Sequence, residues 1–200
     1  MTIRKSTITA LALATTLSLA GCTSAASEGT SPHDGQHTSA ASASTSTEFN
    51  DADVMFASMM IVHHQQAVEM SEILLANTGV DADVAALAQD IKDAQEPEIA
   101  TLKGWLDDWG VDANSTDTHS MDHGDGMMSD DDLAQLEAAD GDSASALYLE
   151  QMIAHHEGAV AMAETEVDTG LNGDAVELAQ QIIDAQSDEI EQMRDMLAAL

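Results

Sequence analysis

The sequence predicts an all-α protein: a four-helix bundle made of two copies of one helical hairpin, with a short extra helix between the copies. Composition favours helices, because aromatic residues form 2% of the chain and proline occurs twice, whereas Ala, Leu, Met, Gln and Glu are plentiful. The second observation is an internal repeat that spans a whole hairpin. Two hairpins, each with an apolar face too large to leave in water, should pack together.

The repeat is clearest in an eleven-residue motif. Residues 60–70 read MIVHHQQAVEM and residues 152–162 read MIAHHEGAVAM, with seven of the eleven positions identical at a spacing of 92. The similarity continues into the following helix at a spacing of 91, where AQDIKDAQEPEI becomes AQQIIDAQSDEI. The repeated unit is therefore the whole helical hairpin.

Cap residues and glycines set the expected helix boundaries. In the first hairpin, we expect helices from a cap at Asn50 to about residue 77 and from a cap at Asp81 to about residue 108. In the second, we expect helices from a cap near Asp142 to about residue 168, before Gly170, and from residue 173 to the C-terminus. The caps of the two copies should correspond, and a short helix should cover residues 130–139.

Pro97 has no counterpart in the second copy, where Asp188 occupies the equivalent position. A proline inside a helix removes one backbone donor and disturbs the preceding turn. We therefore expect the second helix to kink or break locally near Asp93.

The N-terminus is typical of an export signal. Arg4 and Lys5 precede an apolar run over residues 8–20, and the run ends in Leu-Ala-Gly-Cys. This ending resembles a bacterial lipobox, in which Cys22 becomes the lipid-modified first residue of the mature chain. A transmembrane anchor would need about 20 apolar residues, more than this run supplies. We expect residues 1–21 to be a lipoprotein signal peptide and the protein to be exported, lipid-anchored at Cys22 on the outer face of the bacterial cell membrane.

The mature chain should consist of a disordered tether and one folded domain. Residues 22–49 are rich in Ser, Thr and Ala and have almost no large apolar side chains, so they cannot form a core. Residues 50–200 suit a single domain. After signal-peptide removal, three basic residues remain against 37 acidic ones. This charge excludes nucleic acid as a partner. It also concentrates cations, although it would equally serve solubility alone.

The repeated motif carries side chains that bind transition metals. On a helix, His63 and His64 lie one turn from Met60, so each copy presents imidazoles and thioethers on one apolar flank. Imidazole and thioether ligands together favour copper. The alternative is packing, because methionines and single histidines on an apolar face are usually core residues. Glu72 and Glu164, two turns after His64 and His156, are candidates to orient an imidazole.

A second candidate metal site is the loop between the hairpins, residues 109–129. Methionines in such a polar loop would have no core to fill, and Met suits Cu(I) or Ag(I) whereas His with Asp suits Cu(II). The alternative is a disordered connector in which these residues occur by chance. The candidate ligands are His119, Met121, His123, Met127 and Met128.

The duplicated pattern M-I-x-H-H-x-x-A-V-x-M, followed by A-Q-x-x-E-I, resembles the domain of unknown function 305 (DUF305) family, which includes the copper-binding CopM proteins. The resemblance covers essentially the whole folded part. It implies a ferritin-like four-helix bundle that is exported and linked to copper or silver handling. Position by position, the family motif falls on Met60, His63, His64, Met70, Met152, His155, His156 and Met162.

These observations favour an exported, lipid-anchored protein that sequesters or buffers copper, and secondarily silver, rather than an enzyme. The sequence indicates no protein partner and no catalytic residues. A di-metal oxidase on the same architecture would need Glu-x-x-His motifs, and no Glu lies three residues before any of the four helix histidines. The remaining alternative is a structural or partner-binding surface lipoprotein whose His and Met side chains only pack.

Overall fold

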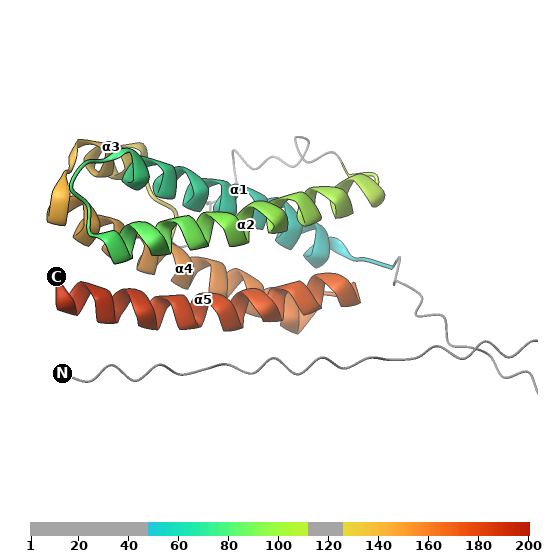
Figure 1. The fold of residues 1–200 in the computed structure, drawn as a ribbon. Coiled ribbons are helices and arrows are strands. Elements are labelled where there is room, and N and C mark those ends of the chain that lie inside the picture. Colours follow the sequence, from blue (N-terminus) through green and yellow to red (C-terminus); the bar gives the residue numbers. More distant parts are fainter. Residues whose placement is uncertain (1–47, 112–125) are drawn as a thin grey trace, which may run out of the picture. The chain divides into compact units, whose positions relative to one another are not determined.

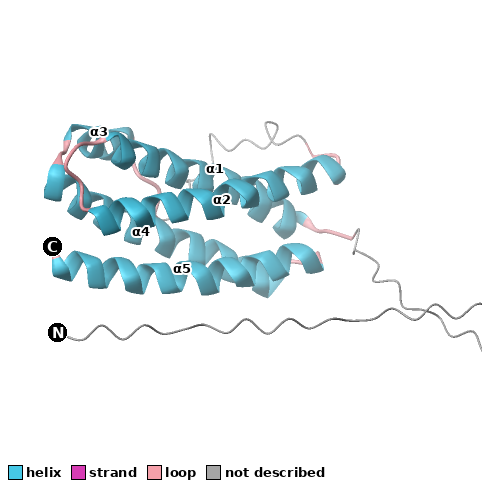
Figure 2. Cartoon of the chain, in the orientation of Figure 1, coloured by secondary structure: helices cyan, strands magenta, loops and turns pink. Residues whose placement is uncertain are grey.

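The computed structural model describes residues 48–111 and 126–200. Throughout these two ranges the regular structure is entirely α-helical (Figures 1 and 2), which confirms the predicted fold class. The helices are α1 (Asp51–Ala76), α2 (Ala82–Asp108), α3 (Asp130–Ala138), α4 (Gly141–Thr169) and α5 (Gly173–Ala199). None of them is long and apolar enough to cross a membrane.

Two hairpins, α1–α2 and α4–α5, pack against each other through α1 and α4 (Figure 1). The two inner helices are antiparallel, because the start of α1 contacts the end of α4 and the reverse. Asn50 Nδ2 donates to Thr169 O at 2.9 Å, and towards the other end of the interface the hydroxyls of Ser71 and Tyr148 lie 2.9 Å apart. The duplicated four-helix bundle is therefore confirmed. The short helix α3 lies across α1 and α4 at one end of the interface.

Side-chain caps start most of the helices. Asn50 and Asp53 form a capping box at α1, and Asp81 and Asn172 cap α2 and α5. These boundaries agree with the sequence expectation to within a residue or two. Ser129 caps α3 in the same way.

The start of α4 differs from its expected form. Asp140, not Asp142, is the N-cap residue, and its side chain makes no capping hydrogen bond. Gly141 follows with φ of 53° and donates its N–H to Thr78 O at 3.0 Å. The turn after α1 thus binds the start of α4 directly, so the expected correspondence of caps between the two copies is wrong here.

Pro97 does not break α2, which runs continuously from Ala82 to Asp108. The carbonyl that loses its donor belongs to Asp93, and both Pro97 and Asp93 are exposed. Water can satisfy such a carbonyl, so the missing hydrogen bond does not interrupt the helix. The expected local break is therefore not found.

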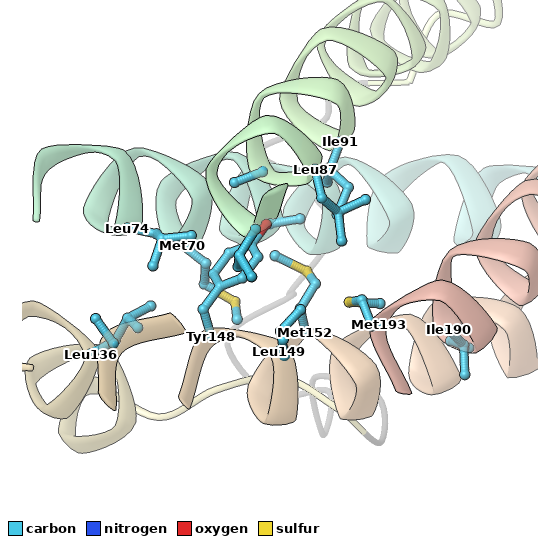
Figure 3. Close-up of a cluster of buried hydrophobic side chains, with 14 residues drawn as sticks. Met70, Leu74, Leu87, Ile91, Leu136, Tyr148, Leu149, Met152, Ile190 and Met193 are labelled. Carbon is cyan, nitrogen blue, oxygen red and sulfur yellow. The ribbon is translucent and has the colours of Figure 1, made fainter. Parts of the chain in front are cut away.

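Apolar side chains form two buried clusters, one towards each end of the α1–α4 interface. The first includes Leu136 of α3 (Figure 3), and the second contains Phe56 and lies near the start of α1. Between them α1 and α4 contribute four histidines, all at most 2% exposed. Burial of polar rings at the middle of a bundle calls for an explanation, because unpaired polar groups in a core are destabilising.

Candidate metal site

His63 of α1 and His155 of α4 meet at the centre of the bundle. Their ring centroids are 3.7 Å apart and their planes are inclined by 40°. The repeat explains the contact. Because α1 and α4 are antiparallel copies of one helix, an approximate two-fold axis relates them, and the residues nearest the axis face their own counterparts. His63 and His155 occupy that place.

The neighbouring histidines each contact a carboxylate from the second helix of their own hairpin. His64 Nε2 lies 2.7 Å from Glu98 Oε2, and His156 Nε2 lies 2.8 Å from Glu189 Oε2. An ionised carboxylate only accepts, so in the neutral ring Nε2 carries the proton and Nδ1 presents its lone pair. Metal-binding histidines are commonly held by a carboxylate in this way.

The expected orienting residues, Glu72 and Glu164, do not fill this role. Glu72 accepts from Lys92 Nζ at 2.5 Å on the surface, and Glu164 is exposed. Glu98 and Glu189 were overlooked because they come from a different helix. The repeat could have revealed them, since both belong to the A-Q-x-x-E-I segment shared by the two copies.

Polar atoms without hydrogen-bond partners gather at this level of the bundle. Both ring nitrogens of His63 and of His155 lack a partner of ordinary geometry, as does Nδ1 of His64 and of His156. The buried Oε1 atoms of Gln95 and Gln186, also repeat counterparts, are likewise unpartnered. Each such atom destabilises a core by about 1 to 3 kcal/mol. A ligand that accepts lone pairs would offset this cost for the imidazoles.

Burial keeps the two central rings uncharged. Loss of hydration lowers the pKa of His63 from 6.5 to about 3, with smaller contributions from His64 and His156. Burial, then the neighbouring rings of His63, His156 and His64, holds the pKa of His155 well below its ordinary value, although a hydrogen bond with the backbone of His63 opposes the shift. Neutral imidazole is the form that binds metal, so these rings are in the ligand state across the physiological pH range.

The predicted methionines divide into two groups. Met60 and Met152, both fully buried, precede His63 and His155 by three residues and flank the central pair on the same helix faces. Met70 packs beside Leu74 and Tyr148 in the first apolar cluster (Figure 3), which also contains Met152, and Met60 belongs to the second cluster. Met162 lines a pocket near the start of α1.

Nitrogen and carboxylate donors alone do not complete a site. In the parts of the chain that the structure describes, no three His, Cys, Asp or Glu side chains are grouped to hold an ion. A metal at the centre would need ligands besides these, and the buried thioethers of Met60 and Met152 are the candidates that the motif supplies. Mixed imidazole and thioether ligation suits Cu(I) more than a hard divalent ion.

The loop between the hairpins is described only at its end. His119, Met121 and His123 lie outside the described residues, whereas Met127 and Met128 are included and half-buried. Gln66 binds the backbone of Met128 twice, at 2.8 and 2.7 Å. The side chain of Met128 packs on the first apolar cluster. The expectation that the loop methionines have no core to fill is therefore wrong for Met128.

Comparison with known proteins adds the family. The sequence model of the domain of unknown function DUF305 matches residues 53–197. The chain belongs to the DUF305 family. No curated protein matches it. The DUF305 resemblance inferred from the duplicated His-His motif is thus confirmed.

Solved structures of the DUF305 family share the fold. A Streptomyces coelicolor DUF305 protein, provisionally described as secreted, is 39% identical with a TM-score of 0.70, covering 74% of this chain and 93% of its own. A Deinococcus radiodurans DUF305 fragment is 29% identical with a TM-score of 0.66, covering 76% and 98%. CopM in its Cu(I)-bound form is 31% identical with a TM-score of 0.60, covering 74% and 96%. CopM has also been solved with Cu(II) and with silver.

Proposed function

We propose that this DUF305 protein is an exported copper-binding protein that sequesters or buffers Cu(I), with Ag(I) as a second ion. The observation that carries the proposal is the layer of four buried histidines, in which six ring nitrogens have no hydrogen-bond partner of ordinary geometry. Similarity to CopM, which is solved with copper and silver, supports the choice of ion. Copper is the cargo in this proposal, and the protein acts by binding it.

The donor set favours the monovalent ion. His63 and His155 supply neutral nitrogens on the approximate two-fold axis, and Met60 and Met152 supply thioethers. The glutamates hold His64 and His156 in the tautomer that leaves Nδ1 free, although these two rings are not grouped with the central pair to hold one ion. Soft thioethers select Cu(I) and Ag(I), whereas Cu(II) prefers nitrogen and oxygen ligands.

Burial suggests retention rather than rapid exchange. All four imidazoles are at most 2% exposed, so an ion reaches them only when the bundle opens locally. The end of the His/Met loop lies beside the segments of α1 and α4 that carry the histidines. Gln66 binds the backbone of Met128, and Gly126 lies against α4 at Ala154 and Gly158. We propose that the loop ligands His119, Met121, His123 and Met127 form a weaker site that captures ions first.

The proposal includes lipid anchoring at Cys22, which lies outside the described residues. The support is the signal-peptide pattern and its Leu-Ala-Gly-Cys ending. Cys22→Ser should move the protein from the membrane fraction to the soluble exported fraction. A Cys22→Ser variant that stays in the membrane fraction to the same extent as the wild type would contradict the anchor.

The central test is a metal titration of the mature chain with Cu(I), Ag(I), Cu(II) and Zn(II). In His63→Leu/His155→Leu, the tightest Cu(I) step should disappear. The metal-free melting temperature should stay the same or rise, because two poorly satisfied polar groups leave the core. Met70→Leu is the matched control: it changes a buried thioether in the apolar cluster and should keep the tightest step.

Two results would contradict the bundle site. One is a His63→Leu/His155→Leu variant that keeps the tightest step while deletion of residues 119–128 removes it. The other is a wild-type melting temperature that does not respond to copper, since an ion that prefers the native state must stabilise it.

A further inference from the structure

The interface between α1 and α4 has two grooves related by the approximate two-fold axis, and α3 fills one of them. Leu136 of α3 is fully buried there among residues of α1 and α4 (Figure 3). Asn77 Nδ2 donates to Leu136 O at 3.0 Å, and Gln151 Nε2 donates to Asp132 O at 3.1 Å. This groove is therefore closed by both apolar packing and hydrogen bonds.

The second groove is an open pocket of about 200 Å³ between the first half of α1 and the last half of α4. Its lining residues are Ala52, Met55, Phe56, Met59, Met162, Thr165, Glu166 and Thr169. At the repeat spacing of 92, their counterparts in the α3 groove are Ala144, Leu147, Tyr148, Gln151, Met70, Ile73, Leu74 and Asn77. The two grooves are thus built from equivalent positions and can be compared residue by residue.

The covered groove and the open groove differ in the side chains that line them. Leu147 and Gln151 of the covered groove are replaced by Met55 and Met59 in the open one. With Met162, these bring three thioethers to a single pocket. Met55 is 49% exposed, and an exposed methionine contributes little to packing. The sulfur atoms therefore need another explanation.

Glu166 is the second unusual feature of the open groove, where its counterpart is Leu74. The residue is 1% exposed, yet neither carboxylate oxygen has a hydrogen-bond partner of ordinary geometry. Burial, then a side-chain hydrogen bond with Asp53 and repulsion from its charge, raises the pKa of Glu166 to about 8. Asp53 itself is engaged, since it accepts the N–H groups of Leu171 and Asn172 at 3.0 and 2.9 Å. Glu166 thus brings a buried carboxyl group, paired only with another carboxyl group, to the wall of the methionine pocket.

The sequence just before α1 lacks the leucines with which α3 covers its groove. The residues that fill the covered groove include Leu133 and Leu136. At the repeat spacing of 92, the positions equivalent to these leucines lie before α1 and are Ala41 and Ser44. Neither side chain is large and apolar, so this segment could not replace the leucines by packing.

We propose that the open groove is a second soft-metal site, in which the thioethers of Met55, Met59 and Met162 bind Cu(I) or Ag(I) and the carboxyl group of Glu166 releases its proton to solvent as the ion binds, so that the charge is balanced. Thioethers select these ions over hard cations. Met55 and Met59 lie one turn apart on α1, and Met162 and Glu166 lie one turn apart on α4, so two pairs of donors face one pocket from rigid helices. The site is separate from the histidine layer and shares none of its ligands.

The test uses residues 23–200, the mature chain without its anchoring Cys22, and follows individual methionines by NMR of ¹³C-labelled methyl groups during titration with Ag(I). We expect the methyl signals of Met55, Met59 and Met162 to shift together, with one ion bound. Met55→Leu/Met59→Leu/Met162→Leu should bind one fewer Ag(I) ion. Met70→Leu, at the covered counterpart of Met162, should bind the wild-type number.

Two further variants separate this site from the histidine layer. His63→Leu/His155→Leu should leave the three methyl shifts unchanged, and Glu166→Gln should weaken the groove step by about tenfold while the fold is retained. Unshifted groove methyls, or an unchanged Ag(I) count in the triple variant with wild-type helicity, would overturn the proposal. The groove would then be a surface for an apolar helix, as its α3-covered counterpart is.

Discussion

The two ends of the α1–α4 interface started from the same sequence and now differ in what covers them. At one end α3 buries Leu136 against Tyr148 and Leu74, and the groove is apolar. At the other the counterparts Phe56 and Glu166 line an open pocket that also holds three methionines. The difference shows that a duplicated hairpin preserves backbone packing, while the side chains of each groove depend on whether a covering segment is present.

The centre of the interface shows the opposite behaviour. His63 and His155 face each other on the axis, and the pairs His64–Glu98 and His156–Glu189 have almost the same length, 2.7 and 2.8 Å. Both copies have kept the same polar residues at a place where polarity is unfavourable for stability. The metal proposals therefore rest on two kinds of observation: agreement between the copies at the centre, and divergence at the open end.

The largest difference between the ends should appear when each loses one large side chain. Leu136→Ala removes a fully buried side chain that closes the covered groove, so it should destabilise the protein by about 2 to 5 kcal/mol. For a domain of this size the melting temperature should fall on the order of 5 to 15 °C. Thermal unfolding of the metal-free protein measures the change.

Met55→Ala is the matched control at the open end. Its side chain is 49% exposed, so the variant should unfold within about 1 kcal/mol of the wild type. If both substitutions had the same effect on the melting temperature, the two grooves would be equally packed and the contrast between them would be wrong.

The next prediction concerns pH and Glu166, which occupies in the open groove the position that Leu74 occupies in the covered one. The pKa of Glu166 is about 8 in the folded protein and 4.5 in its ordinary state, so the folded state binds more protons between these values. The stabilisation is complete below pH 4.5 and is lost as pH rises towards 8. Glu166→Leu, which copies the covered groove, should remove this loss and be more stable than the wild type at pH 8.5 by on the order of 1 to 3 kcal/mol.

The free energy of unfolding must be compared between Glu166→Leu and the wild type at each pH, because the titration of His63 changes stability in the opposite direction. Its lowered pKa of about 3 makes stability fall as pH drops from 6.5 towards 3. Chemical denaturation of both proteins at several pH values from 5 to 8.5 cancels that contribution. Parallel stability curves would show that Glu166 is not protonated in the folded state.

At the centre the two copies should respond alike. Glu98→Gln and Glu189→Gln each remove a carboxylate that contacts a histidine Nε2, and loss of such a group typically lowers metal affinity tenfold to a hundredfold. We expect equal losses of Cu(I) affinity in the two variants, measured by competition with a chromophoric chelator. Unequal losses would mean that the metal draws on one copy of the motif and not on both.

The fold was predictable because the information is local and repeated. The caps Asn50, Asp81 and Asn172 carry the side-chain chemistry that starts a helix, and the repeat showed that the hairpin is the unit. The start of α4 was misplaced because the Gly141–Thr78 hydrogen bond joins residues 63 positions apart. No local pattern announces such a contact. The expected break at Pro97 was wrong because the loss of one backbone donor matters less on an exposed face, and the sequence does not state exposure.

The candidate site was predictable only in part. Spacing placed His63 and His155 on apolar faces, but it could not show that they touch, since that follows from the antiparallel approach of α1 and α4. The expectation for Glu72 and Glu164 was wrong for the same reason. Spacing along the sequence relates residues of one helix, whereas Glu98 and Glu189, which contact the histidines, come from the neighbouring helix. Met162 was grouped with the histidines by motif, and the structure places it in the open groove.

The smallest effect concerns a hydrogen bond that exists only at the covered end. Ser71 Oγ and Tyr148 Oη lie 2.9 Å apart and are buried, and their counterparts at the open end are Ala163 and Phe56. Tyr148→Phe should destabilise the protein by about 1 kcal/mol, because Ser71 Oγ keeps its bond to Ala67 O at 2.8 Å. Ser71→Ala should cost more, since it leaves the buried tyrosine hydroxyl without a partner.

The double variant Ser71→Ala/Tyr148→Phe reproduces at the covered end the pair found at the open end. Because both polar groups leave together, no buried hydroxyl remains unsatisfied, and the loss should be less than the sum of the two single losses by about 0.5 to 1.5 kcal/mol. Urea unfolding of the four proteins measures this coupling. Additive losses would mean that the two hydroxyls do not interact, and that the covered groove is closed by α3 and its apolar contacts alone.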